Sequence, residues 1–177
     1  VGGVLCIVSE TTDRVASDRR LRDSEARFQA ISNSIEQMVW STQPDGHHDY
    51  YNQRWYDYTG ASKEESDAEP WRGMMHPDDQ DRAWSAWQRC LATGEPYRIE
   101  SRLRHQGDHY RWVLGRAQAV RDEAGRITRW FGTFTDIQDI VDAREVLASS
   151  REALSREVTE RTRERDRIWK VSRDLLG

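Results

Sequence analysis

The stretch that decides the fold runs from Tyr97 to Ile137 and reads YRIESRLRHQGDHYRWVLGRAQAVRDEAGRITRWFGTFTDI. Segments rich in β-branched and aromatic residues alternate here with two short turn sequences, Gln106-Gly107-Asp108 and Glu123-Ala124-Gly125. The pattern predicts three strands, at Tyr97–His105, His109–Val120 and Arg126–Ile137. Because connections this short join neighbouring strands as hairpins, the three strands are expected to be antiparallel.

The residues before this stretch predict two more strands and a group of helices. Met38–Thr42 and Asp49–Tyr51 flank the turn sequence Pro44-Asp45-Gly46, which is typical of a hairpin. Capping residues and helix-stop glycines then predict helices at Gln53–Thr59, Ser62–Glu65 and Asp78–Thr93. Two strands, several helices and three strands in about 110 residues predict an α+β fold, a five-stranded antiparallel sheet with the helices on one face.

The other face of this sheet is also expected to be covered. Tyr110, Trp112 and Leu114 alternate with Val113 and other apolar residues, and Trp130 alternates with Phe131, so the last two predicted strands carry bulky groups on both faces. A sheet with one wet face shows a cleaner alternation. The helix predicted at Ser24–Ile35, or a partner chain, is expected to cover this second face.

The two ends of the chain differ in composition from its middle. Sixteen of the 17 aromatic residues lie between Phe28 and Phe134, whereas 18 of the 40 residues from 138 to 177 are charged. The core is therefore expected in the middle, between helical linkers. The chain reads as a piece of a larger protein, with these expected parts: 1–9 the last strand of a preceding domain, 10–24 a linker helix, 25–137 the folded domain, 138–170 an output helix, and 171–177 the start of the next domain.

The output helix carries a seven-residue apolar repeat. Ile140, Leu147, Leu154 and Ile168 share one spacing, which Arg161 interrupts. This narrow seam favours a weak parallel coiled coil, and a parallel homodimer through both flanking helices is expected. The alternative is a single solvated helix with ion pairs such as Glu157–Arg161.

Composition excludes several classes of protein. A net charge of -4 argues against nucleic-acid binding. The longest apolar stretch, Val1–Val8, is far shorter than the ~18 residues of a membrane helix, and no signal-peptide pattern precedes it, so a cytoplasmic protein without direct membrane insertion is expected. Cys6 and Cys90 form no CxxC pair, which excludes a disulfide framework and a cysteine zinc site.

Several short motifs occur in a fixed order from Glu25 to Gln138. They are Val39-Trp40 before Pro44-Asp45-Gly46, Tyr51-Asn52 before Tyr58-Thr59-Gly60, Trp71 with His76-Pro77-Asp78-Asp79, Tyr110-Arg111-Trp112, and Thr135-Asp136-Ile137. Together they resemble a PAS domain with its PAC segment, of the Trp-rich subfamily common in bacterial sensor histidine kinases. One departure is Gln138, where the family often has threonine. The resemblance implies a sensory or dimerising module that regulates a histidine kinase or a diguanylate cyclase in the same parent chain, together with adjacent sensory domains.

Two groups of residues are candidate functional sites. Six aromatic residues either line a cofactor cavity or form a filled core: Trp40, Tyr51, Trp55, Trp87, Trp112 and Phe134. Thr135, Asp136 and Ile137 form the predicted signal hinge between sheet and output helix. Asp136 either caps that helix or pairs with Arg111 or Arg116.

No cofactor is identified by the sequence. A haem would need a histidine between Asp78 and Gly94, where none occurs, and Cys90 lies too late in that helix for flavin photochemistry, so neither haem nor flavin is expected. His76 reads as part of a helix start and His47-His48-Asp49 as solvated turn residues, so no metal site is expected. No nucleophile–base pair stands out, and the chain itself is not expected to be an enzyme.

Overall fold

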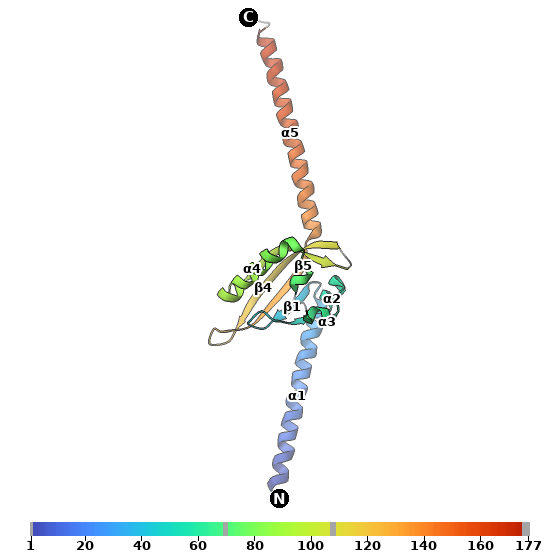
Figure 1. Cartoon of the computed structure of the whole chain (residues 1–177), viewed down its shortest axis with the longest axis vertical. Coiled ribbons are helices and arrows are strands. Elements are labelled where there is room, and N and C mark those ends of the chain that lie inside the picture. Colours follow the sequence, from blue (N-terminus) through green and yellow to red (C-terminus); the bar gives the residue numbers. More distant parts are fainter. Residues whose placement is uncertain (1, 69–70, 107–108, 175–177) are drawn as a thin grey trace. The chain divides into compact units, whose positions relative to one another are not determined.

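The computed structural model of the chain describes residues 2–68, 71–106 and 109–174. Two compact units meet after Asp136 (Figure 1). The elements of the first unit are α1 (Gly2–Ser34), β1 (Met38–Thr42), β2 (His48–Tyr51), α2 (Gln53–Thr59), α3 (Lys63–Ala68), the 3₁₀ helix η1 (Trp71–Met74), α4 (Pro77–Thr93), β3 (Tyr97–His105), β4 (His109–Arg121) and β5 (Ile127–Asp136). The second unit contains α5 (Gln138–Asp174).

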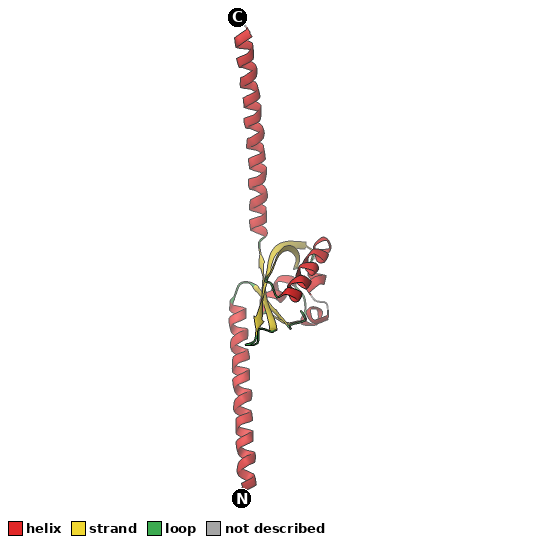
Figure 2. Cartoon of the chain, turned by 90° about the vertical axis from the view of Figure 1, so that its left-hand side faces the viewer, coloured by secondary structure: helices red, strands yellow, loops and turns green. Residues whose placement is uncertain are grey.

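The five strands form one antiparallel sheet in the order β2-β1-β5-β4-β3. Helices α2 to α4 lie on one face of it (Figure 2). The predicted α+β fold is therefore confirmed, and each predicted strand agrees with the structure to within one residue at either end. The first and last strands, β1 and β5, pair in the middle of the sheet, so the residues that leave the domain come from its centre.

The predicted capping signals also appear in the structure. The side chain of Asn52 accepts a hydrogen bond from the Trp55 N–H at the start of α2, and Gly60 and Gly94 end α2 and α4 with positive φ angles of 70° and 74°. His76 Nδ1 accepts from the Asp78 N–H at 3.2 Å. His76 is thus part of a helix start, as predicted, and its ring contacts Tyr110.

Two predictions of local structure in the first 51 residues are wrong. Residues 2–8 belong to α1 and not to a strand, because a short apolar run suits helix and strand equally and no turn residue separates this run from the helical sequence that follows. His48 is not a solvated turn residue: it begins β2, is buried, and stacks on Tyr51. Its strand position turns the ring into the core, while His47 beside it stays exposed.

The end of α1 covers part of the second face of the sheet. The Phe28 ring contacts Tyr50 on β2 and Phe131 on β5, with ring centroids 5.1 and 6.1 Å apart. Ser32 is buried and shares a hydrogen bond with the Tyr50 hydroxyl. The covering expected from Ser24–Ile35 is therefore present over β2 and β5, whereas Val120 on β4 remains exposed.

Asn52 joins α1, β1 and α2. Its side-chain oxygen accepts from the Val39 N–H at 3.0 Å, and its amide donates to the carbonyls of Ser32 and Gln37 at 2.8 and 3.0 Å. The residue is 1% exposed. This single side chain therefore satisfies backbone groups of three segments and fixes where α1 meets the domain.

Asp79 holds the start of α4 against β3. Its carboxylate accepts from the Arg102 backbone N–H and from the Arg102 Nε, both at 2.9 Å. Burial alone would raise the pKa of Asp79, but the hydrogen bonds from Arg102 lower it to about 2. The ion pair thus stays charged at neutral pH.

The core places one glycine directly against a tryptophan. A Cβ atom at Gly132 on β5 would lie 2.2 Å from an indole carbon of Trp40 on the paired strand β1. The φ angle of Gly132 is not in the left-handed region, so the position requires glycine for space alone. Trp40 therefore lies flat across β5 where any side chain would clash.

Helix α5 forms the whole described part of the second unit. Its apolar residues Ile140, Leu147 and Leu154 are exposed, and Glu157 pairs with Arg161 at 2.8 Å. The helix continues to Asp174, so residues 171–174 extend the output helix, while 175–177 lie outside the described residues. None of the helices described here has the length and apolarity required to span a membrane.

Candidate functional site

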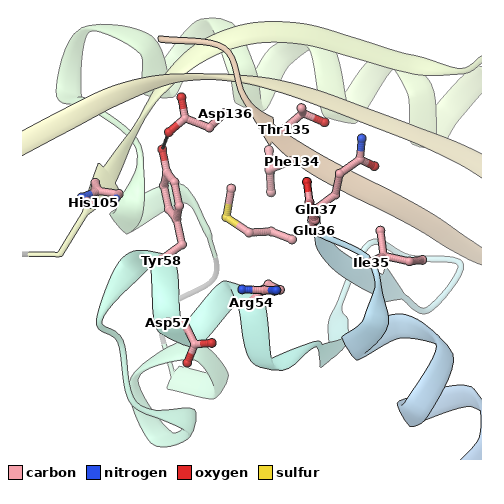
Figure 3. Close-up of a pocket in the computed structure, with 11 residues that line it drawn as sticks. Ile35, Glu36, Gln37, Arg54, Asp57, Tyr58, His105, Phe134, Thr135 and Asp136 are labelled. Atoms are coloured by element: carbon pink, nitrogen blue, oxygen red, sulfur yellow. Dashed lines mark hydrogen bonds between the residues drawn. The ribbon is translucent and has the colours of Figure 1, made fainter. Parts of the chain in front are cut away.

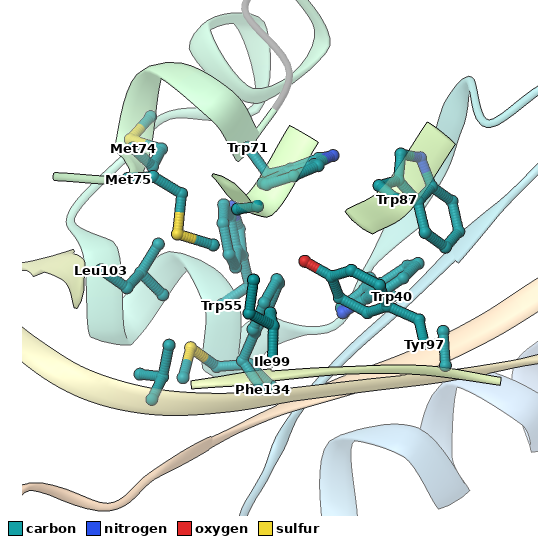
Figure 4. Close-up of a cluster of buried hydrophobic side chains, with 14 of the residues drawn as sticks. Trp40, Trp55, Trp71, Met74, Met75, Trp87, Tyr97, Ile99, Leu103 and Phe134 are labelled. Carbon is teal, nitrogen blue, oxygen red and sulfur yellow. The ribbon is translucent and has the colours of Figure 1, made fainter. Parts of the chain in front are cut away.

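The predicted aromatic residues meet in the core between the sheet and the helices. Trp40, Trp55, Trp87 and Phe134 are each at most 2% exposed (Figure 4). Ring centroids lie 5.6 Å apart for Trp40 and Trp87, 5.7 Å for Trp40 and Phe134, and 5.9 Å for Trp55 and Phe134. Tyr51 stacks on Trp55 at 4.5 Å. These are ordinary aromatic contact distances, so five of the six predicted rings pack on one another.

Trp112 lies apart from this cluster. It is half-buried, and the Arg102 guanidinium lies over its ring at 5.5 Å. The neighbouring Val113 is fully buried in the core, and side chains alternate along a strand, so Trp112 points to the opposite face of the sheet. Its predicted place in a cavity is therefore wrong, because bulky residues occur on both faces of β4.

Three buried aromatic residues of the core are missing from the predicted set: Trp71, Tyr97 and Trp130. Trp130 and Tyr97 contact Trp87 at 5.2 and 5.3 Å between ring centroids. Alternation within β3 and β5 could have found both residues, since each shares a face with a core position two residues away.

Several polar atoms in this cluster lack hydrogen-bond partners. They are the indole nitrogens of Trp40 and Trp130 and the hydroxyl of Tyr97, all fully buried. His48 is buried beside Trp40, at 4.9 Å between rings, and neither of its ring nitrogens has a partner of good geometry. Burial lowers the pKa of His48 to about 3, against a weaker opposite effect of the Gly46 backbone, so its ring is neutral. Buried polar groups are normally paired, so these unpaired atoms are the chemically unusual feature of the core.

The predicted hinge contains an ion pair. Asp136 is the last residue of β5, and its Oδ2 accepts from the Arg111 Nε at 2.7 Å. The Tyr58 hydroxyl donates to the same oxygen at 2.8 Å (Figure 3). Burial and this hydrogen bond raise the pKa of Tyr58 well above its usual value, so the hydroxyl remains a donor. Of the two arginines considered for Asp136, Arg111 is the one found beside it.

The N-cap of α5 falls one residue after Asp136. The Ile137 carbonyl accepts the hydrogen bond of the Val141 N–H at 3.0 Å, which defines the cap position. The aspartate therefore precedes the helix, and its carboxylate is tied to α2 and β4. Sequence reasoning did not place Tyr58 at the hinge; it noted the residue only in the motif Tyr58-Thr59-Gly60 that ends α2.

A groove opens beside this ion pair. It has a volume of about 770 Å³, and its polar lining includes Arg54, Tyr58, His105 and Asp136. Its apolar lining comes from Ile35, Met38 and Phe134 (Figure 3). The predicted hinge residues Thr135 and Asp136 thus lie at a surface that α2 and residues 35–37, which follow α1, also reach.

The fold and this site define a small α+β domain, in which an antiparallel sheet and a helical layer enclose an aromatic core and an ion pair lies where the chain leaves the sheet. Residues 48–134 match a family model described as the PAS fold. A crystal structure of a sensory box histidine kinase/response regulator from Burkholderia thailandensis is 28% identical, with a TM-score of 0.56 over 73% of this chain and 98% of that one. The central domain is a PAS domain.

Two curated proteins are also similar. A protein of Sinorhizobium fredii called uncharacterized protein y4lL is 31% identical over 153 residues, or 86% of this chain. The peroxide stress-activated histidine kinase mak1 of Schizosaccharomyces pombe is 30% identical over 113 residues, or 63% of this chain. The chain spans 18% and 7% of these two proteins, respectively. PAS domains are sensory and non-catalytic, and two of the similar proteins, those of Burkholderia thailandensis and Schizosaccharomyces pombe, are histidine kinases.

Proposed function

We propose that this chain is a signal-relay module of a multidomain protein, most simply a sensor histidine kinase, in which the hinge at Asp136 transmits the state of the PAS domain to α5. The observation that carries the proposal is the ion pair between Asp136 and Arg111, to which Tyr58 adds a hydrogen bond. One carboxylate at the last strand residue is thereby held by both the helical layer and the sheet. A change in either layer alters the position at which α5 begins.

The hinge is testable by amide hydrogen exchange at Val141, whose N–H closes the first turn of α5. Asp136→Asn removes the charge that Arg111 and Tyr58 hold, and it is expected to speed exchange at Val141 about fivefold, since half-exposed ion pairs contribute roughly 1 kcal/mol.

Asp49→Asn is the matched control, because Asp49 is also a strand carboxylate paired with an arginine, Arg129, at 2.9 Å. It is expected to leave exchange at Val141 unchanged. Equal rates at Val141 in the two variants would show that Asp136 does not control the start of α5.

We also propose that the module works as a parallel homodimer through its flanking helices. The exposed Leu147 and Leu154 of α5 continue a seven-residue repeat that starts at Ile140. On α1, Val15 and Leu21 are likewise exposed. In a parallel dimer, the matching helix of the partner chain would bury these exposed side chains of α1 and α5.

A ligand-sensing role is favoured by the unpaired polar atoms around Trp87. The rings that carry them, those of Trp40, Tyr97, Trp130 and the neutral His48, each contact Trp87. A small polar, uncharged molecule would satisfy them, whereas a charged one would meet no counter-ion there. In the alternative role the core is filled by its own rings and the domain only dimerises and relays strain. A diguanylate cyclase as the output domain would fit either role.

Native mass spectrometry of the intact chain decides between these roles. We expect the mass of a dimer with one added small molecule per chain. A dimer without added mass would support the purely structural role instead.

The double variant Leu147→Glu, Leu154→Glu is expected to be monomeric, because four like charges would face one another in the seam. A monomeric unmodified chain would refute the proposed homodimer.

A further inference from the structure

Two histidines face each other at the end of the β3–β4 hairpin. His105 is the last residue of β3 and His109 is the first of β4, and the two are paired directly across the strands. His105 Nδ1 lies 3.1 Å from His109 Nε2. Side chains of directly opposed residues leave the same face of a sheet, so both rings point the same way without any adjustment of the backbone.

This separation is that of a hydrogen bond between the two rings, and it also suits a shared metal ion. Imidazole nitrogens bind zinc at about 2.0–2.1 Å, so two of them on a tetrahedral ion lie about 3.3 Å apart. Two neighbouring ligands at right angles on an octahedral ion lie about 3.0 Å apart at similar bond lengths. The observed 3.1 Å falls between these values. Imidazole also suits zinc, nickel and copper better than it suits magnesium or calcium.

We propose that His105 and His109 together bind one divalent transition-metal ion, with water completing its coordination. The described residues contain no group of three or more histidine, cysteine, aspartate or glutamate side chains placed to hold a metal, so the site is an open one with two protein ligands. Such a site exchanges its ion readily and responds to the concentration of free metal.

The surroundings of His105 favour its role as a ligand. Its backbone is held in β3, directly opposite His109 on β4. Its ring also stands edge-on to Tyr58, with centroids 4.6 Å apart at 88°, which limits its rotation. A bound ion would fix the His105 ring, which contacts Tyr58. Tyr58 in turn donates a hydrogen bond to Asp136 at the hinge.

Isothermal titration of the intact chain, without a histidine tag, with Zn²⁺ near neutral pH tests the site. We expect saturable binding of one ion per chain. His105→Ala and His109→Ala are each expected to weaken that binding about tenfold or more, since even losing a group that only orients a metal ligand costs that much.

His47→Ala is the matched control, because His47 is an exposed histidine in the turn before β2. It is expected to keep full affinity for Zn²⁺. If His105→Ala fails to fold because its ring packs on Tyr58, the exposed His109 carries the test alone. The proposal is overturned if the unmodified chain shows no saturable binding, or if His109→Ala binds Zn²⁺ as tightly as His47→Ala does.

Discussion

Trp87→Ala is expected to lower the free energy of unfolding by about 3–5 kcal/mol, the usual loss for a fully buried aromatic ring. Trp87 is 1% exposed and contacts the rings of Trp40, Tyr97 and Trp130. Its removal leaves a cavity in the middle of the core that these rings cannot fill without leaving their own positions. Urea unfolding followed by circular dichroism measures the loss.

Trp112→Ala is the matched control for this experiment. The same atoms are removed, but the ring is half-buried on the other face of the sheet, beneath the Arg102 guanidinium. A loss of about 1–2 kcal/mol is expected, from partial burial and the cation–π contact. Equal losses in the two variants would contradict the packing described for Trp87.

Asn52→Ala is expected to cost about 3 kcal/mol or more. The substitution leaves the Ser32 and Gln37 carbonyls and the Val39 N–H without their side-chain partner, and each buried polar group left unpaired costs about 1–3 kcal/mol. Because two of these groups belong to the end of α1 and the residues after it, the helix should also detach from the domain. Faster amide exchange near Ser32 than in β4 would report that detachment.

Asn33→Ala provides the comparison for Asn52. Asn33 lies in the same joint and accepts one hydrogen bond, from the Gln53 N–H at 2.9 Å, but it is exposed. Water can replace that partner, so a loss of about 1 kcal/mol or less is expected. If Asn33→Ala were as costly as Asn52→Ala, the burial of the Asn52 network would not be the cause of its effect.

Local signals explain why so much of the fold was predictable. Pro77 and Gly94 mark the two ends of α4, Asn52 and Gly60 mark those of α2, and the turn between β4 and β5 lies where its sequence predicts it. Each of these signals acts through the conformation of one or two residues. They need no knowledge of tertiary packing.

The features that the sequence did not predict depend on contacts between residues far apart in the chain. Trp40 and Trp112 are equally apolar, and only the direction of each strand's side chains places one inside and the other outside the core. Tyr58 reaches Asp136 across 78 positions in sequence, and no local pattern at either residue announces the contact. The apolar run before Ser9 suits a helix and a strand equally, and the structure has it as helix.

The close approach of Gly132 and Trp40 has an evolutionary consequence. An added methyl group at 132 would overlap the indole, so a larger residue there requires a smaller one at position 40 beforehand. If the residue at 132 became larger first, the protein would carry an overpacked core with Trp40 still in place, and selection against unstable proteins would remove it. Position 40 is therefore expected to change to a smaller residue before position 132 changes to a larger one. Relatives with a side chain at the equivalent of 132 should lack tryptophan at the equivalent of 40.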